Sequence, residues 1–318
     1  MEKSMSNNIN NGPKVSYEEF VALFESIKSW SDYSPETLER GALNFITPEI
    51  VKSAAQLVTT GEVITMGLAW NTITGPDNHK PALHYMTELS IDTPGEEPNC
   101  NKDFIGVDYH GKAVSHLDAM THISFRDILF GGKKSTESVN ATGSSWSTVD
   151  KLGPIASRAV LLDAARFAGL DWIEPGTAIH VEDVLAYEKK FGFTIGQGDV
   201  VLLRSGHFAR REKLGVWDPS DFSAGFHVDV MQLFKERKVS VIGADGDSDV
   251  RPSPVVGVGS PIHVLALPAL GIPLLDNLQL EAVASKCAEL NRWIFNIIIS
   301  PLNIPRGTGS PINPIAIF

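Results

Sequence analysis

The chain has 318 residues, 43% of them hydrophobic, and a formal net charge of −11 at pH 7. This length allows one large domain or two ordinary ones with a substantial core, and the acidic excess argues against a nucleic-acid partner, which would need clustered Lys and Arg. Two cysteines are too few for a disulfide scaffold. No segment approaches the ~18 apolar residues of a membrane span, and no signal peptide is recognisable, so we expect a cytoplasmic protein without membrane contact.

The N-terminal part of the chain predicts a tail and two helices. Residues 1–13 are polar and rich in Asn, which is typical of a disordered tail. Ser16 and Glu19 have the spacing of a capping box ahead of apolar residues at helical intervals, and Thr47 is the expected N-cap of a second helix, with Pro at its first position. We expect residues 14–60 to form an N-terminal helical arm.

The apolar face of this arm needs a cover, because an amphipathic helix is stable only when that face is buried. Either the main body or another subunit can provide the cover. Since most soluble oligomers are symmetric homo-oligomers, we expect a homodimer or a higher homo-oligomer.

After residue 60, short apolar runs alternate with helical patterns, which favours an α/β body. Strands are expected over residues 63–70, 104–110, 159–163, 200–203 and 239–243, and helices over residues 181–191, 227–238 and 278–291. The Gly- and Ser-rich run 131–148 predicts a mobile loop, which is either a lid over a site or a plain surface loop.

The stretch 115–122 places two imidazoles and a carboxylate within eight residues. On an extended segment, His116 and Asp118 project from the same face, about 6.6 Å apart, and a turn that starts at Asp118 would bring His122 back over the same place. Histidine nitrogen and aspartate oxygen are ligands of zinc or manganese. The cluster therefore predicts a metal site, and the alternative is a strand end with solvated polar residues.

The pattern His116-x-Asp118-x-x-x-His122 resembles the second half of a known signature, His-x-Gly-Thr-His-x-Asp-x-Pro-x-His. That signature belongs to the cyclase-like metal hydrolases, the family that includes bacterial kynurenine formamidase and isatin hydrolase. The signature's first His falls here at Lys112, so one imidazole is missing and the number of metal ions stays open. His110, two residues earlier, would replace the missing imidazole if the backbone bulges.

Two later segments resemble the family's remaining ligand pair, a His followed by a Glu. They supply His263 and Asp276, the latter shorter than Glu by one methylene. Asp276 is either a ligand or the N-cap of the helix expected from residue 278. Nearby, the acidic run 245–249 lacks the Gly and Glu positions of an EF-hand, so we expect turn-forming or site-facing residues there rather than a calcium loop.

The resemblance implies a single swivelling β/β/α-type catalytic domain over residues 61–318 and a metal-dependent hydrolase that opens a small amide, lactam or lactone. The divalent zinc or manganese ion would be held by His116, Asp118, His263 and Asp276. His122 is the predicted general base and then acid, because an imidazole exchanges protons near neutral pH. His110 and Trp70 are expected to support the site or to bind the small-molecule substrate. The alternatives are a metal-dependent cyclase or lyase, and a non-catalytic binding protein on the same fold.

Overall fold

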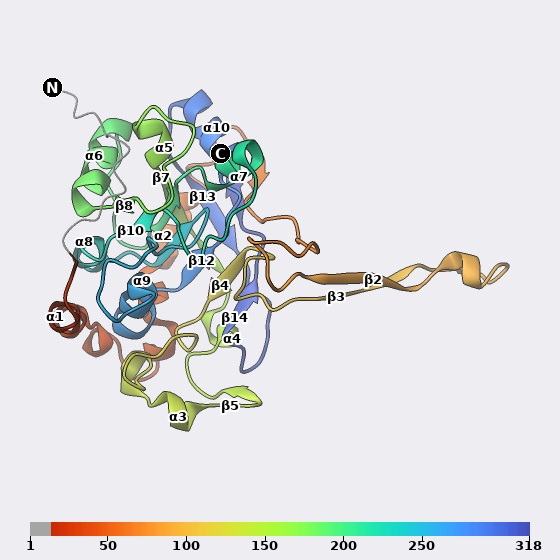
Figure 1. Cartoon of the computed structure of the whole chain (residues 1–318), viewed down its shortest axis with the longest axis horizontal. Coiled ribbons are helices and arrows are strands. Elements are labelled where there is room, and N and C mark those ends of the chain that lie inside the picture. Colours follow the sequence, from red (N-terminus) through yellow and green to blue (C-terminus); the bar gives the residue numbers. More distant parts are fainter. Residues whose placement is uncertain (1–13) are drawn as a thin grey trace.

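The computed structural model describes residues 14–318, and its centre is a mixed sheet of nine strands (Figure 1). In spatial order these are β1 (Val63–Thr65), β15 (Ile315–Ile317), β13 (Ile294–Ile299), β7 (Ile155–Asp163), β9 (Val200–Arg204), β11 (Val241–Ala244), β12 (Leu274–Asp276), β4 (His116–Asp118) and β14 (Gly309–Pro311). The strands from β7 to β12 run parallel, and the other pairs are antiparallel. The tail predicted over residues 1–13 lies outside the described residues.

The parallel centre of the sheet consists of apolar runs without interruption. Every residue of β9 and β11 is buried. Parallel strands are covered on both faces, so they contain continuous Val, Ile and Leu rather than an alternation of polar and apolar residues. The strands predicted over residues 159–163 and 200–203 are confirmed, and β7 begins earlier, at Ile155.

Helices and helical turns surround this sheet. The α-helices are α1 (Tyr17–Ile27), α2 (Pro48–Ala55), α3 (Ser135–Ser138), α4 (Val149–Leu152), α5 (Ala164–Phe167), α6 (Val181–Phe191), α7 (His207–Leu214), α8 (Val230–Glu236), α9 (Pro261–Val264) and α10 (Glu281–Leu290). The other helical segments are the 3-10 turns Trp30–Asp32, Leu38–Phe45, Ser90–Asp92 and Phe130–Gly132 and the π-helical turn Leu265–Leu270. Within residues 14–318, no helix combines the length and the apolar character needed to cross a membrane.

The helices predicted in the N-terminal arm are present, and they pack on the body of the same chain. The Ser16 side chain accepts a hydrogen bond from the Glu19 amide, and the Glu19 carboxylate accepts one from the Ser16 amide, so the predicted capping box is confirmed. Phe20 and Phe24 are buried and contact the Phe125 ring with centroids 5.6 and 5.0 Å away. The apolar face of α1 is therefore buried by the same chain. This face gives no reason to expect an oligomer.

Several predicted elements are shorter than expected because their ends bond elsewhere. The strand expected over residues 63–70 stops at Thr65, where the chain leaves β15, and the Leu68 amide then donates to Ser115 Oγ over 2.8 Å. The helices expected over residues 227–238 and 278–291 are α8 and α10, which begin at Val230 and Glu281.

The run 131–148, predicted as a mobile loop, contains ordered local structure. It includes α3 and the small hairpin of β5 (Val139–Asn140) and β6 (Gly143–Ser144). The Trp146 indole donates to the Phe130 carbonyl over 2.8 Å, and the Ser147 amide donates to the Glu39 carboxylate over 2.9 Å. These hydrogen bonds connect the segment to the helical turns Phe130–Gly132 and Leu38–Phe45.

A long hairpin of β2 (Leu83–Glu88) and β3 (Lys102–Gly106) projects away from the body (Figure 1). The strand predicted over residues 104–110 corresponds to β3 but is displaced towards the N-terminus. Tyr85 and Phe104 stack on one face of the hairpin, with ring centroids 5.1 Å apart, and both remain exposed.

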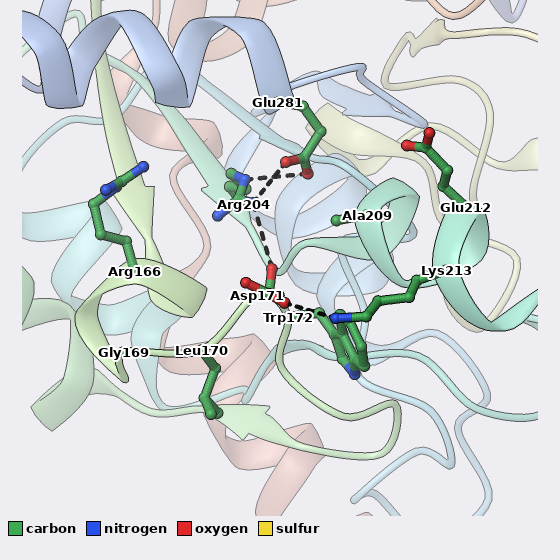
Figure 2. A pocket seen from close by; sticks show the side chains of 10 residues that line it. All are labelled: Arg166, Gly169, Leu170, Asp171, Trp172, Arg204, Ala209, Glu212, Lys213 and Glu281. Carbon is green, nitrogen blue, oxygen red and sulfur yellow. Dashed lines mark hydrogen bonds and ion pairs between the residues drawn. The ribbon is translucent and has the colours of Figure 1, made fainter.

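An ion-pair network joins the central strands to α10, and Figure 2 shows the part formed by Arg204 and Glu281. Arg204, at the end of β9, donates to Asp163 over 2.7 Å and to Glu281 over 2.6 Å. We expect Arg204→Met to destabilise the protein by about 3–5 kcal/mol, because Asp163 is fully buried and would lose this partner. Chemical denaturation would measure the change. Lys213→Met is the matched control, since the Lys213–Asp171 pair is exposed and should contribute little; equal effects in the two variants would contradict the prediction.

Candidate metal centre

The strand β4 supplies the centre of the predicted site. His116 and Asp118 are both buried and project from the same face of this strand, as the sequence spacing predicts. β4 pairs with β12 on one side, with His116 opposite Asp276, and with β14 on the other. Antiparallel pairing thus brings together two parts of the chain that are distant in sequence.

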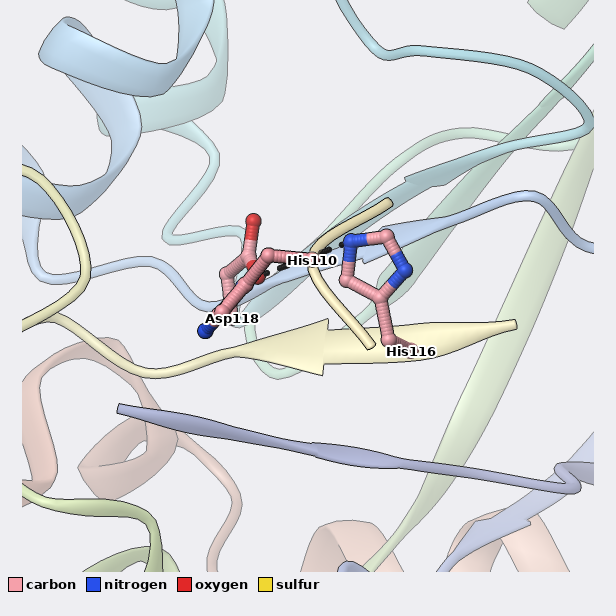
Figure 3. Close-up of side chains that lie close together, drawn as sticks. All are labelled: His110, His116 and Asp118. Carbon is pink, nitrogen blue, oxygen red and sulfur yellow. Dashed lines mark hydrogen bonds and ion pairs between the residues drawn. The ribbon is translucent and has the colours of Figure 1, made fainter. Parts of the chain in front are cut away.

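Asp118 lies at the middle of four imidazoles. Its Oδ1 is 2.7 Å from His110 Nδ1 and 3.7 Å from His116 Nε2 (Figure 3). Its Oδ2 is 3.5 Å from His263 Nε2 and 3.8 Å from His122 Nε2. Burial alone would raise the pKa of Asp118, but these histidines outweigh burial and hold that pKa well below its usual value. The group therefore carries a buried negative charge.

Asp118 Oδ2 is buried and has no hydrogen-bond partner within residues 14–318. Together with His263 and Asp276 it forms a group of donor atoms that can reach one metal ion, and all three residues are buried. His263 Nε2 is 3.5 Å from Asp118 Oδ2 and 3.3 Å from Asp276 Oδ2. Two donors bound to one ion at 2.0–2.2 Å are roughly 3.3–3.6 Å apart. These two carboxylates and one imidazole, with one carboxylate oxygen lacking a hydrogen-bond partner, therefore fit a divalent cation.

Neighbouring polar groups fix the orientation of these donors. Asp249 Oδ2 is 2.6 Å from His263 Nδ1, which directs His263 Nε2 towards Asp118 and Asp276. Ser248 donates its hydroxyl to Asp276 Oδ1 over 2.9 Å, so Asp276 Oδ2 remains available. Burial opposes a charge on His263, yet the three surrounding carboxylates raise its pKa well above the usual value. Such support is typical of residues that hold a metal.

Asp276 is the last residue of β12 and does not cap a helix. α10 begins at Glu281, and its N-cap position is Leu280. The alternative role predicted for Asp276, as an N-cap, is therefore wrong. The helix expected from residue 278 starts too late for Asp276 to reach its free amide groups.

His110 has a closer connection to the centre than the sequence predicts. Its Nε2 is 2.8 Å from Thr308 Oγ1, and its Nδ1 is the atom that contacts Asp118. A Cβ atom at Gly309 would lie only 2.9 Å from the His110 ring, so the glycine at this position makes room for the imidazole. With both nitrogens bonded, His110 can orient Asp118.

His122 reaches the cluster through a turn after β4, as predicted. The His122 amide donates to the Ala119 carbonyl over 2.8 Å, and the His122 ring stacks on His110 with centroids 3.7 Å apart. Burial lowers the pKa of His122 to about 4, so its imidazole is neutral at neutral pH. His122 belongs to neither of the two donor groups that contain Asp118.

The acidic run 245–249 divides into a structural and a site-facing part. Asp245 accepts hydrogen bonds from the amides of residues 205–207 and fixes that loop. Asp247 and Asp249 lie beside His263 and form a further donor group with it. Asp247 is already bonded by the Arg251 guanidinium over 2.8 Å, so this group is less suited to a metal. The spacing of acids after a predicted strand was the signal for these residues, but it did not show which of them faces the site.

Trp70 belongs to none of the donor groups and lies on the wall of a cavity of about 330 Å³. Lys112, which occupies the position of the signature's first His, also lines this cavity. A larger cavity of about 680 Å³ lies beside Arg204 and Trp172 (Figure 2). Two ion pairs line it, Arg204 with Glu281 and Lys213 with Asp171, and neither cavity contains a residue of the donor groups. The smaller cavity is the better candidate for a substrate site, because its wall includes Lys112, which lies 3.7 Å from Asp247, and Asn277, which follows Asp276 in the chain.

Comparisons with known proteins agree with this arrangement. The sequence model of a family described as "Putative cyclase" matches residues 81–248, more than half of the 318-residue chain. The chain belongs to the cyclase family. No curated protein matches it.

Solved structures show the cyclase fold over nearly the whole chain. A crystal structure of a novel cyclase is similar over 93% of this chain and 99% of its own, with 25% sequence identity and a TM-score of 0.82. Isatin hydrolase A from Labrenzia aggregata, bound to benzyl benzoate, is similar over 84% of this chain and 97% of its own, with 17% identity and a TM-score of 0.58. An isatin hydrolase bound to the product analogue thioisatinate covers 90% of this chain and 99% of its own, with 17% identity and a TM-score of 0.55. At this identity the isatin hydrolases establish a shared fold.

Proposed function

We propose that this cyclase-family protein is a metal-dependent hydrolase that opens a small amide, lactam or lactone. The observation that carries the proposal is the buried Asp118 Oδ2, which has no hydrogen-bond partner within residues 14–318 and faces His263 beside Asp276. A buried carboxylate oxygen without a partner is costly. A bound cation removes that cost, and the isatin hydrolases that share the fold support a hydrolytic reaction.

In this proposal, Asp118, His263 and Asp276 hold a zinc or manganese ion, and His116 is an additional ligand. When bound there, a divalent ion lowers the pKa of a water molecule and polarises the substrate carbonyl. Asp249 keeps His263 Nε2 directed at the ligand carboxylates, and Ser248 keeps one oxygen of Asp276 free. These contacts from Asp249 and Ser248 hold the metal-binding atoms in place before the substrate binds.

His122 is the proposed general base and then general acid. Its imidazole is neutral, partly exposed and close to Asp118, so it can accept a proton from the attacking water. The same imidazolium then donates the proton to the leaving nitrogen or oxygen. His110 stacks on the His122 ring and limits its rotation.

A metal-dependent cyclase or lyase is the second candidate, because the matching family is described as a cyclase family. It would use the same residues on an enolisable carbonyl. A test of both starts with purified protein loaded with zinc or manganese, offered a series of amides, lactams and lactones. Products that contain the elements of water support the hydrolase; products of elimination or ring closure support the second candidate. Metal binding without turnover of any substrate would support a binding protein on the same fold.

We also propose that residues 61–318 form the catalytic domain, that residues 14–60 extend it, and that the protein is a homo-oligomer. The feature that supports an oligomer is the β2–β3 hairpin. An isolated pair of strands is only marginally stable in water, and this one exposes Leu83, Tyr85 and Phe104. A second copy of the chain would cover them.

We expect the double variant Tyr85→Ser, Phe104→Ser to reduce the oligomer to a smaller species, because it removes two exposed aromatic side chains from one face of the hairpin. Light scattering after size-exclusion chromatography would measure the mass. Leu185→Ser, which removes an exposed apolar side chain from α6, is the control and should keep the wild-type mass. Wild-type protein that is monomeric at every concentration would contradict the proposal.

A further inference from the structure

The cavity beside Trp70 adjoins the candidate metal centre. Its volume is about 330 Å³, and its wall includes Lys112 and Asn277, the residue that follows the proposed ligand Asp276. Lys112 Nζ is 3.7 Å from Asp247 Oδ2, and Asp247 Oδ1 is 3.8 Å from His263 Nδ1. One carboxyl group therefore separates the ammonium group in the cavity from a proposed metal ligand.

Within residues 14–318, the positive charge of Lys112 has one ion-pair partner, Asp247 Oδ2, at the long distance of 3.7 Å. Its side chain is only 23% exposed, and its ammonium group makes no hydrogen bond within residues 14–318. The neighbouring Asp247 carboxylate is instead bonded by the Arg251 guanidinium, with Nε at 2.8 Å and Nη2 at 2.7 Å. A partly buried ammonium group without a hydrogen-bond acceptor can bind an anion from solution.

The remaining charges of the cavity cancel one another. Arg211 forms an ion pair with Asp77 over 2.5 Å. Burial lowers the pKa of His207 to about 3, and the nearby cations contribute, so this imidazole is neutral. The rest of the wall is largely apolar and includes Leu68, Ile73 and Phe208. The cavity thus combines one positive charge, held only by the long ion pair of Lys112 with Asp247, with an apolar and aromatic lining.

We propose that Lys112 binds a carboxylate of the substrate, so that the enzyme acts on small amides, lactams or esters that carry a carboxylate on an apolar or aromatic body. This inference rests on the proposed function. Lys112 stands where the family signature has a His, so a position that offers a neutral imidazole in that signature supplies a fixed cation in this chain. The carboxylate of the substrate occupies the Lys112 end of the cavity, and the bond to be broken lies towards Asp118 and His263.

Benzoate and benzamide are matched probes for this subsite, because they have similar shapes and differ in charge. Titration calorimetry on the metal-loaded protein should show that benzoate binds more tightly than benzamide. Lys112→Met should weaken benzoate binding by roughly 10- to 100-fold, the usual effect of losing a charged hydrogen bond, and should change benzamide binding by less than about 3-fold. Lys112→Arg keeps the charge and should retain most of the preference.

Two controls separate this subsite from other sources of binding. Lys80→Met removes an exposed lysine that pairs with Asp108 and should leave both affinities unchanged. The titrations are repeated on chelator-treated protein, where the Lys112-dependent preference should persist. Equal loss of both probes in Lys112→Met, or a preference that disappears with the metal, would overturn the inference. The titrations measure binding and do not depend on turnover. An absence of hydrolysis would therefore contradict the proposed function without affecting the result for Lys112.

Discussion

Asp118→Ala is expected to remove nearly all of the divalent metal from the purified protein. Asp118 belongs to both donor groups at β4, and its Oδ2 is the buried oxygen without a partner. Its removal leaves one carboxylate, that of Asp276, beside the His263 imidazole. Such a pair is a weak site for a divalent cation. Elemental analysis after dialysis measures the content.

Thermal unfolding gives a second measurement of the same loss. A metal that binds only the folded state raises the unfolding midpoint, and the shift grows with the logarithm of the metal concentration relative to its Kd. Added zinc or manganese should therefore stabilise metal-stripped wild-type protein and should have little effect on Asp118→Ala. Asp103→Ala, on the exposed hairpin, is the control and should behave as wild type. Unchanged metal content in Asp118→Ala would place the ion elsewhere, with the group of Asp247, Asp249 and His263 next to be examined.

Local signals in the sequence were sufficient for the central elements of the fold. The helix predicted over residues 181–191 has the same bounds as α6, because its apolar spacing, acidic first turn and Gly after the last residue all agree. The strand at residues 200–203 was predictable because its apolar run is bounded by glycines. By contrast, nothing local shows that β4 lies between β12 and β14, since strand pairing at this sequence distance depends on the whole sheet.

The same distinction applies to the site. The period of two along a strand places His116 and Asp118 on one face, and the structure agrees. His263 and Asp276 came from the family resemblance, because their approach to Asp118 depends on the pairing of β4 with β12. The contact of Asp249 with His263 could not be predicted, since the acids of the 245–249 run look alike in the sequence.

The N-terminal helices show a different limit. The amphipathic pattern of α1 predicted an apolar face that needs a cover, and Phe20 and Phe24 are buried as expected. The pattern did not show which surface provides the cover. The body of the same chain does so, and an argument for a second subunit has to come from surface that stays exposed, such as the hairpin. A periodic pattern gives the need for burial but not the identity of the partner.

His122→Ala is expected to reduce turnover by roughly 10²- to 10⁴-fold while the metal content stays near that of wild type, because the proposed role of His122 is proton transfer. His116→Ala is expected to lose the metal. The contrast is sharp because the two residues lie six positions apart and both face Asp118, with Nε2 atoms 3.8 and 3.7 Å from its oxygens. These distances alone are compatible with a ligand role for either residue.

Metal analysis and turnover, measured on both variants with whichever amide, lactam or lactone is hydrolysed, separate the two roles. Removal of a general base leaves the part of the rate enhancement that the metal supplies. His122→Ala should therefore retain slow turnover that still requires the metal. His122→Gln is the conservative variant, which preserves a polar group beside His110 but cannot carry the proton, and it should be as slow as His122→Ala. Equal metal loss in His122→Ala and His116→Ala would make His122 a ligand. The proton would then have to be carried by another group, and His110, which stacks on His122 and bonds Asp118, is the nearest candidate.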